Sequence, residues 1–234
     1  MKNPFEEFRS HTTRSKGKEL PLDRILKAKE ETLNQILKGY ENLLKNEAKD
    51  LVWLMQYSTV IKAYSIAEEA IKGINYAAED IEEFCYVLDK TDQVPYLITG
   101  PAGVYISALC NNAQEEEIVL RLQDVGIKIN LLGYRLPEGK RLIIEGNVGD
   151  FTGISLEGGE LIIEGSAKNY TGAGMKKGRI IVKQNVGFNT GHGMTGGEIL
   201  VGGRIKGLGK VVGGKIYEKG QLVFPSDDYR PFYF

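Results

Sequence analysis

The segment that decides the fold is residues 141–197, where one pattern of 19 residues occurs three times without insertion. The copies read RLIIEGNVGDFTGISLEGG (141–159), ELIIEGSAKNYTGAGMKKG (160–178) and RIIVKQNVGFNTGHGMTGG (179–197). A fixed period of this size is typical of a solenoid, in which each unit stacks only on its neighbours. The repeat therefore predicts a column of successive coils.

Each copy begins with an apolar trio and turns at glycines. The repeated positions are the trios 142–144, 161–163 and 180–182, the threonines Thr152, Thr171 and Thr190, and the glycines Gly153, Gly159, Gly172, Gly178, Gly191 and Gly197. A trio rich in β-branched residues forms a strand and is too short for a helix. Because glycine tolerates positive φ, the glycine positions predict corners. Such coils stack in parallel at about 4.8 Å, with like residues in ladders, so the sequence predicts a parallel β-helix.

The repeat continues beyond its three regular copies. Residues 198–214 keep an apolar trio and a closing glycine pair in a shortened unit, and 116–140 read as a longer, imperfect first coil. We therefore expect a β-helix over 116–224, with about five coils and a partial sixth at 216–224. Atypical end units are expected, because terminal coils must cover an open core.

The middle residue of each trio predicts an apolar ladder on the outside of the coil. Neighbouring side chains of a strand point to opposite faces, so the middle residue faces out when its neighbours face the lumen. The ladder consists of Ile143, Ile162, Ile181 and Leu200. Leaving all four in water would forfeit about 6 to 12 kcal/mol. We expect a cover, and two remain open: the chain's own helices or another protein chain.

The N-terminal part divides into a flexible arm at 1–20, a helical region at 21–92 and a connector at 93–115. One helix presents an apolar face made of Leu33, Ile36, Leu37, Tyr40, Leu43 and Leu44. A second helical run begins at Leu51, with Trp53 as a packing anchor. Residues 65–68 have the spacing of a capping box that starts a third helix, which continues to about Leu88 with or without a break at Gly73. In the connector, 96–99 read as a strand, 100–103 as a turn, and 104–109 as either a strand or a helix.

The C-terminal tail, residues 225–234, is strongly aromatic. It predicts either a plug over the open end of the β-helix or a segment that docks into a neighbouring subunit, since aromatic residues and Arg are enriched at interfaces. Both alternatives remain open.

Composition narrows the functional classes. The formal net charge of −1 gives no general case for nucleic acid. No apolar run approaches the roughly 20 residues of a membrane span, and the sequence begins with acidic residues where a signal peptide needs an apolar core. We expect a cytoplasmic protein that binds neither membrane nor nucleic acid. Cys85 and Cys110 lack metal-type spacing and are expected to be buried small hydrophobes.

Three candidate chemical motifs have simpler structural explanations. Acidic residues between 68 and 83 would need Glu-x-x-His pairs to form a di-iron site, and only His11 precedes the repeat. Residues 191–196 match the dinucleotide fingerprint G-x-G-x-x-G, but an apolar trio typical of a strand follows instead of a helix. His192 is expected to be an exposed corner residue, and the column Asn147, Ser166 and Asn185 a polar corner ladder. We therefore expect no catalytic, cofactor-binding or metal-binding residue.

The glycine corners carry a resemblance to a known family. Residues 171–178 and 190–197, joined to strands such as 180–182, resemble the GXGXG domain, which is found at the C-terminus of the glutamate synthase large subunit and in one of the subunits of formylmethanofuran dehydrogenase. The likeness covers about residues 116–216, and the first corner departs from it with Ile154, Ser155 and Leu156. The resemblance implies a single-stranded, right-handed parallel β-helix with a structural role inside larger redox enzymes, and it transfers no catalytic residue.

Together these observations predict an α+β protein with an N-terminal helical region and a C-terminal β-helix. The expected function is that of a non-catalytic scaffold or subunit-docking protein, within an oxidoreductase assembly as the resemblance implies. A stand-alone structural homo-oligomer and a weak hydrolase or esterase are the alternatives. The partner is expected to be a protein or a second copy, and no cofactor is expected.

Overall fold

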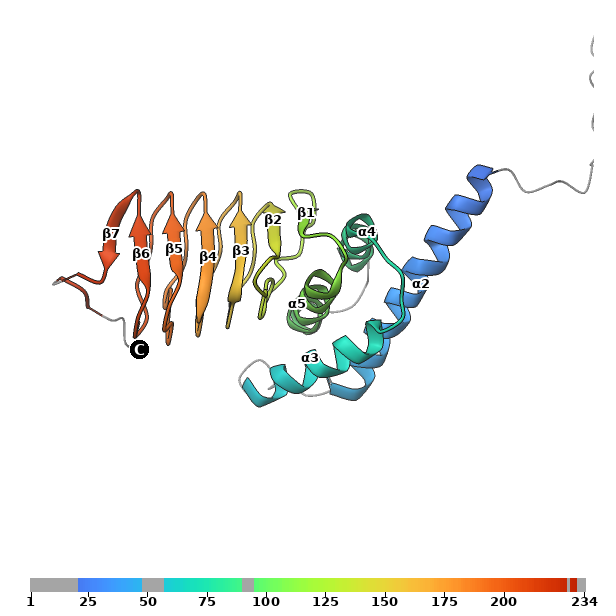
Figure 1. Ribbon diagram of the computed structural model, residues 1–234, viewed down its shortest axis with the longest axis horizontal. Coiled ribbons are helices and arrows are strands. Elements are labelled where there is room, and N and C mark those ends of the chain that lie inside the picture. The colour runs from blue at the N-terminus through green and yellow to red at the C-terminus, as the bar shows by residue number, and fades with distance from the viewer. Residues whose placement is uncertain (1–20, 48–56, 90–94, 227, 231–234) are drawn as a thin grey trace, which may run out of the picture.

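The computed structural model describes residues 21–47, 57–89, 95–226 and 228–230. The described chain has an N-terminal helical region followed by a predominantly parallel β-solenoid of about four turns. Figure 1 shows the helices gathered at one end of the sheet, with the strands extending away from them in sequence order. None of the described helices is long and apolar enough to cross a membrane.

Helix α2 (Pro21–Glu47) confirms the predicted amphipathic face, because Ile36, Tyr40 and Leu43 are buried. Helix α3 (Tyr57–Ile71) runs through the predicted capping box, so that prediction is wrong: the Ser65 hydroxyl donates to the Ile61 carbonyl one turn earlier, at 3.3 Å. Residues 1–20 and Trp53, for which we predicted an arm and a packing anchor, lie outside the described residues.

The third predicted helix is a separate element, α4 (Ala78–Asp89). Helix α3 ends at Ile71, and Gly73 just after it adopts a φ of 83°. The N-terminus of α4 is capped by the Asp80 carboxylate, which accepts a hydrogen bond from the Ala77 amide at 2.9 Å. A carboxylate in the first turn also faces the positive end of the helix dipole.

Residues Pro95–Asn112 form helix α5, so the strand predicted at 96–99 and the turn predicted at 100–103 are wrong, and of the two alternatives at 104–109 the helix is the one observed. Residues 100–110 are all buried, so the helix is surrounded by protein and shows no amphipathic period. Gly103 permits this packing, because a Cβ there would lie 1.6 Å from the Asn130 carbonyl oxygen. The Gly-Pro pair that predicted a turn lies inside the helix, with Pro101 in its second turn.

The sheet contains seven strands in sequence order. They are β1 (Glu117–Arg121), β2 (Arg141–Glu145), β3 (Glu157–Ile163), β4 (Lys177–Val182), β5 (Glu198–Val201), β6 (Lys215–Glu218) and β7 (Gln221–Phe224). Strands β1 to β6 pair in parallel, and residues at equivalent positions of the trios are register partners on neighbouring strands. Strand β7 turns back antiparallel to β6, so the predicted partial sixth coil is a hairpin. The turns at both ends are irregular, which leaves about four instead of five.

The interior of the solenoid consists of stacked apolar ladders. The first and third residues of each trio are fully buried, as the period-two alternation predicts. At the glycine corners, backbone positions with positive φ recur in every turn, at 131, 133 and 135, then 151, 153 and 155, 170, 172 and 174, and 189, 191 and 193. Several of them carry side chains, including Phe151 and Tyr170 at 59° each. The coil geometry therefore overrides the usual preference for glycine at these positions.

Both ends of the solenoid are covered. At the first end, α5 and α4 pack against the opening: the Ser107 hydroxyl donates to the Leu131 carbonyl at 3.0 Å, and the Tyr86 hydroxyl to the Arg121 carbonyl at 2.8 Å. At the other end, the Tyr229 hydroxyl accepts from the Val211 amide and donates to the Gly209 carbonyl, both at 2.7 Å. Tyr229 of the tail therefore packs against the last coil, and both roles expected for the tail, a plug and a docking segment, remain predictions. The last four residues lie outside the description.

Candidate functional site

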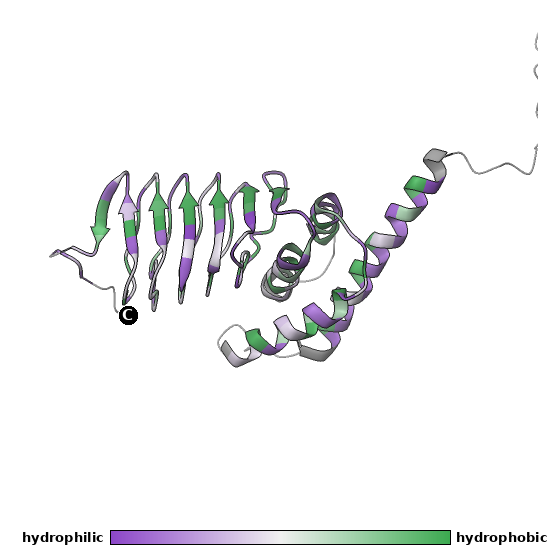
Figure 2. Cartoon of the chain, viewed as in Figure 1, coloured by the Kyte–Doolittle hydropathy of each residue, from purple (hydrophilic) through white to green (hydrophobic). Residues whose placement is uncertain are grey.

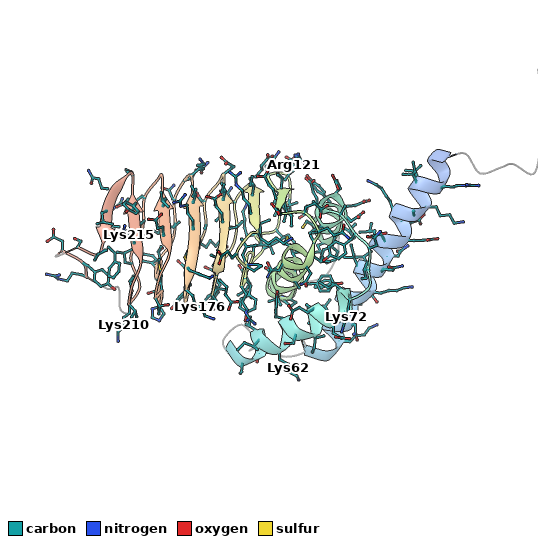
Figure 3. The ribbon with its side chains drawn as sticks, in the orientation of Figure 1. Lys62, Lys72, Arg121, Lys176, Lys210 and Lys215 are labelled. Atoms are coloured by element: carbon teal, nitrogen blue, oxygen red, sulfur yellow. The ribbon has the colours of Figure 1, made fainter. Side chains whose placement is uncertain are left out.

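The outer face of strands β1 to β6 is the most regular surface of the described chain. From the residue before each apolar trio onward the strands keep one register, so alternate residues of this part form straight columns across the sheet. Figure 2 shows the hydrophobic residues of neighbouring strands lying side by side. Figure 3 marks Arg121 and Lys215, which lie near the two ends of this face.

The central column is apolar, and we call it the apolar stripe. It consists of Val119, Ile143, Ile162, Ile181, Leu200 and Tyr217. The prediction that the middle trio residues point outward is confirmed, because they alternate with the fully buried lumen residues. Each is nevertheless half-buried or better, and Ile162 is only 7% exposed. Stacking of like residues within the ladder therefore removes much of the cost that the sequence suggested.

The described helices leave most of the stripe uncovered. Helix α4 contacts β1, and Figure 1 shows α2, α4 and α5 at that end of the sheet, while α3 runs below the starts of the first strands. Strands β3 to β6 extend away from the helices (Figure 1). We had expected either the chain's own helices or another protein chain to cover the stripe. The described helices do not cover it along β3 to β6.

A ladder of alternating charge borders the stripe at the start of the strands, and we call it the charge ladder. In strand order it reads Glu117, Arg141, Glu160, Arg179, Glu198 and Lys215. Arg141 pairs with Glu117 at 2.8 Å and with Glu160 at 3.0 Å, and Arg179 pairs with Glu160 at 3.8 Å and with Glu198 at 3.1 Å. Such exposed pairs add little stability, so their order matters more for recognition than for folding.

A second column of mostly charged residues follows the stripe at the ends of the strands. It begins with Arg121 and Glu145, which pair in the sheet, and continues in the residues just after the strands, whose amides bond to the preceding coil: Glu164, Lys183, Gly202 and Lys219. Arg121 connects it to the helices, because its guanidinium lies 3.2 Å from the Glu82 carboxylate of α4 and 3.9 Å from that of Glu145. The apolar stripe is thus enclosed by charged columns on both sides, an arrangement that resembles the apolar centre and polar rim of a protein interface.

The corner residues have structural roles. His192 is exposed, as predicted; its Nδ1 accepts from the Lys210 amide at 3.4 Å, and its ring meets Tyr170 edge to face. The Thr171 and Thr190 hydroxyls are buried and donate to backbone carbonyls three residues earlier, at 3.0 and 3.2 Å. Neither is therefore placed to act as a nucleophile toward His192.

The polar corner column is the predicted ladder. Asn147 Oδ1 accepts from the Ser166 amide at 2.8 Å, and Asn185 Oδ1 accepts from the Arg204 amide at 2.9 Å. Each bond joins one coil to the next. The sequence did not indicate a second ladder of this kind, in which Asn130 Oδ1 accepts from the Asp150 amide at 2.8 Å and Asn169 Oδ1 from the Phe188 amide at 2.9 Å.

The glycine motif at 191–196 leads into strand β5, as the sequence indicated. A helix that could direct its N-terminus at a pyrophosphate does not follow it. Within the described residues, no three His, Cys, Asp or Glu side chains form a group that could hold a metal ion. Cys85 and Cys110 are fully buried free thiols, as predicted, and burial raises the pKa of Cys110 to about 12.

A polar cleft of about 330 Å³ lies where the helices meet the solenoid. Its lining includes Tyr64 of α3, Asn111 of α5, and Arg135 and Glu157 of the coils. Arg135 lies 3.2 Å from Glu157 and 5.9 Å from the centre of the Tyr64 ring. Burial alone would raise the pKa of Glu157, but hydrogen bonds from Lys176 and Arg135 outweigh it and lower that pKa. The helices are joined to the coils here by the contact of Arg135 with Tyr64 and by Asn111, whose side-chain amide donates to the Tyr134 carbonyl at 3.0 Å.

Comparison with known proteins adds no identification, because no family model, curated protein or solved structure matches this chain. We predicted the apolar stripe from the sequence but did not predict the charge ladder beside it. The signal was present: the residue before each apolar trio alternates in sign from one copy to the next.

Proposed function

We propose that this protein is a scaffold that docks a protein partner on the outer face of β1 to β6. The observation that carries the proposal is the apolar stripe, which runs straight across six strands and is bordered by charged columns. The described helices close the end of the solenoid and leave the stripe along β3 to β6 available to a partner. A face of this kind, apolar at its centre and charged at its rim, suits association with another protein.

The resemblance of the glycine corners to GXGXG repeats supports an assembly of the oxidoreductase type, with this chain as a structural component. A hydrolase centred on His192 is a weaker candidate. The contacts of His192 are the Tyr170 ring and a backbone amide, and the neighbouring threonine hydroxyls are engaged with carbonyls.

The proposal is tested by the mass of the particle that contains the chain when it is isolated under native conditions from its own cells. We expect a mass above the 26.0 kDa of one chain. An Ile181→Lys change should reduce it to the single-chain mass, because the ammonium group would have to be desolvated in the docked face. Ile181 points outward, so the folded monomer tolerates the change.

The matched control is Val212→Lys, at an apolar residue that is 66% exposed and lies outside strands β1 to β6. This variant should retain the native mass. Circular dichroism verifies that both variants are folded. A wild-type chain with the mass of a single copy, or equal dissociation of the two variants, would refute the docking function.

A further inference from the structure

We infer that the docked partner is a second copy of this chain, bound face to face with its solenoid axis antiparallel. This inference rests on the proposed docking function of the sheet face and names its occupant. In this dimer, a two-fold axis runs parallel to the strands and lies between β3 and β4. The axis places β1 of one copy over β6 of the other, β2 over β5, and β3 over β4.

The order of the charge ladder supports this arrangement. Along β1 to β6 the signs alternate from negative at Glu117 to positive at Lys215, over six positions. An alternating series with an even number of members changes sign at every position when it is reversed. The two-fold axis therefore sets Glu117 against Lys215, Arg141 against Glu198, and Glu160 against Arg179 of the second copy. Six opposite-charge pairs result, and no like pair occurs in this ladder.

The other face-to-face dimer has its two-fold axis along the solenoid, and the charges oppose it. That axis would set the charge ladder against the second charged column of the other copy. Glu160 would then face Glu164, and Arg179 would face Lys183, so like charges would meet at the centre. Opposite charges would meet only at one end of this form, where Glu117 faces Arg121 and Arg141 faces Glu145, whereas every pair of the charge ladder is opposite in the antiparallel form. Because like charges in opposition disfavour an interface, the sequence order favours the antiparallel form.

Near the two-fold axis, the second charged column is also compatible with the antiparallel form. There, Glu164 faces Lys183 of the other copy, which adds two opposite-charge pairs. Only at the far ends does Arg121 face Lys219, where solvent screens the repulsion. The apolar stripe meets itself in reverse order, with Ile162 near Ile181.

The size of the face predicts a reversible dimer. Six strands about 4.8 Å apart and five residues at about 3.3 Å each give a flat area of about 29 by 16 Å, or about 470 Å² per copy. Both copies together would bury about 950 Å², below the roughly 1,200 Å² of standard stable interfaces. The constant register keeps the columns straight, so two such faces can meet along their length.

The test is a charge swap at the central pair, read by sedimentation equilibrium of the purified full chain. Each of Glu160→Arg and Arg179→Glu sets two pairs of like charges against each other in the dimer. Each variant alone should weaken self-association by at least about tenfold. An equimolar mixture should restore it, because the variants then present opposite charges to one another at both central pairs.

Recovery on mixing cannot arise from misfolding of either variant, since each would have to refold in the presence of the other. The control is Lys168→Glu, a charge reversal at an exposed corner residue outside the face, which should leave association unchanged. A wild-type chain that stays monomeric at every concentration, or a mixture that associates no better than its components, would overturn the antiparallel dimer.

Failure of the antiparallel dimer can be distinguished from failure of the docking function. If the purified chain is monomeric, but the native particle contains a different polypeptide that Ile181→Lys releases, the dimer is refuted and the docking function stands. If neither a second copy nor another chain depends on the face, both proposals fail.

Discussion

Two glycines with nearly the same backbone conformation offer a direct test of how the corners meet the core. Gly172 has a φ of 67° and Gly193 a φ of 68°. A Cβ on Gly172 would lie 2.5 Å from Cδ1 of Ile199 and 3.2 Å from Cδ1 of Ile180, and both isoleucines are fully buried. A Cβ on Gly193 would meet nothing closer than the Gly174 amide nitrogen, at 4.0 Å.

The expected cost of an alanine follows from these contacts. At either site, positive φ costs a residue with a side chain about 1–2 kcal/mol, and the stiffer unfolded chain returns about 0.4–1 kcal/mol. Gly193→Ala should therefore lower the free energy of unfolding by at most about 1.5 kcal/mol. Gly172→Ala adds the overpacking of two buried isoleucines, which costs about 1–3 kcal/mol more. Because φ is shared, the difference between the variants isolates the packing term.

The assay is urea denaturation of both variants and the wild type, followed by circular dichroism, with the midpoints compared at a common slope. Gly172→Ala should have the lowest midpoint by a clear margin. Equal midpoints, or a lower midpoint for Gly193→Ala, would refute the view that the column of Gly172 faces a tightly packed lumen.

Three further outcomes follow from particular contacts. Thr171→Val should lower the free energy of unfolding by about 0.5–1.5 kcal/mol in urea denaturation, because the buried hydroxyl donates to a carbonyl at 3.0 Å. Lys140→Met should cost about 1.5–3 kcal/mol by the same measurement, since its ammonium group donates to two carbonyls just after α5, at 2.5 and 2.6 Å. Burial raises the pKa of Tyr64 to about 12, so its hydroxyl stays protonated in the fold while the unfolded chain ionises near pH 10. The stability from this group is complete below pH 10 and is lost as the pH rises toward 12, and a tyrosinate absorbance titration that tracks unfolding checks it.

The β-solenoid could be predicted because its information is local and repeated. Each trio specifies a strand, and the constant spacing of 19 residues sets Ile143, Ile162 and Ile181 in register without knowledge of the rest of the chain. The positive φ of Phe151 and Tyr170 could not be predicted in this way. Bulky residues disfavour that conformation, and only the stacking of neighbouring coils imposes it.

Helix α5 was predicted only in part, with a helix left as one alternative at 104–109, and its full extent was missed for a different reason. Its residues 100–110 are buried on every side, so the sequence carries no alternation of polar and apolar residues to mark a helix. The Gly100-Pro101 pair also has the appearance of a turn. A helix inside a protein core is specified by the surrounding packing, which a single sequence does not display.

The candidate docking face was predictable in part. Side-chain alternation in a strand was enough to place Ile143 and Ile181 outside. Whether helices cover them depends on where the helical region packs, which is a tertiary property. The helices lie at one end of the solenoid, where α4 contacts β1, and only the structure shows this.

The most direct test of the central claim is hydroxyl-radical footprinting of the chain, free at low concentration and in its native assembly. We expect Ile181, Leu200 and Tyr217 to lose reactivity on assembly, while exposed Val212 keeps it. Unchanged reactivity along the apolar stripe, with protection elsewhere, would contradict the claim that this face is where the protein binds its partner.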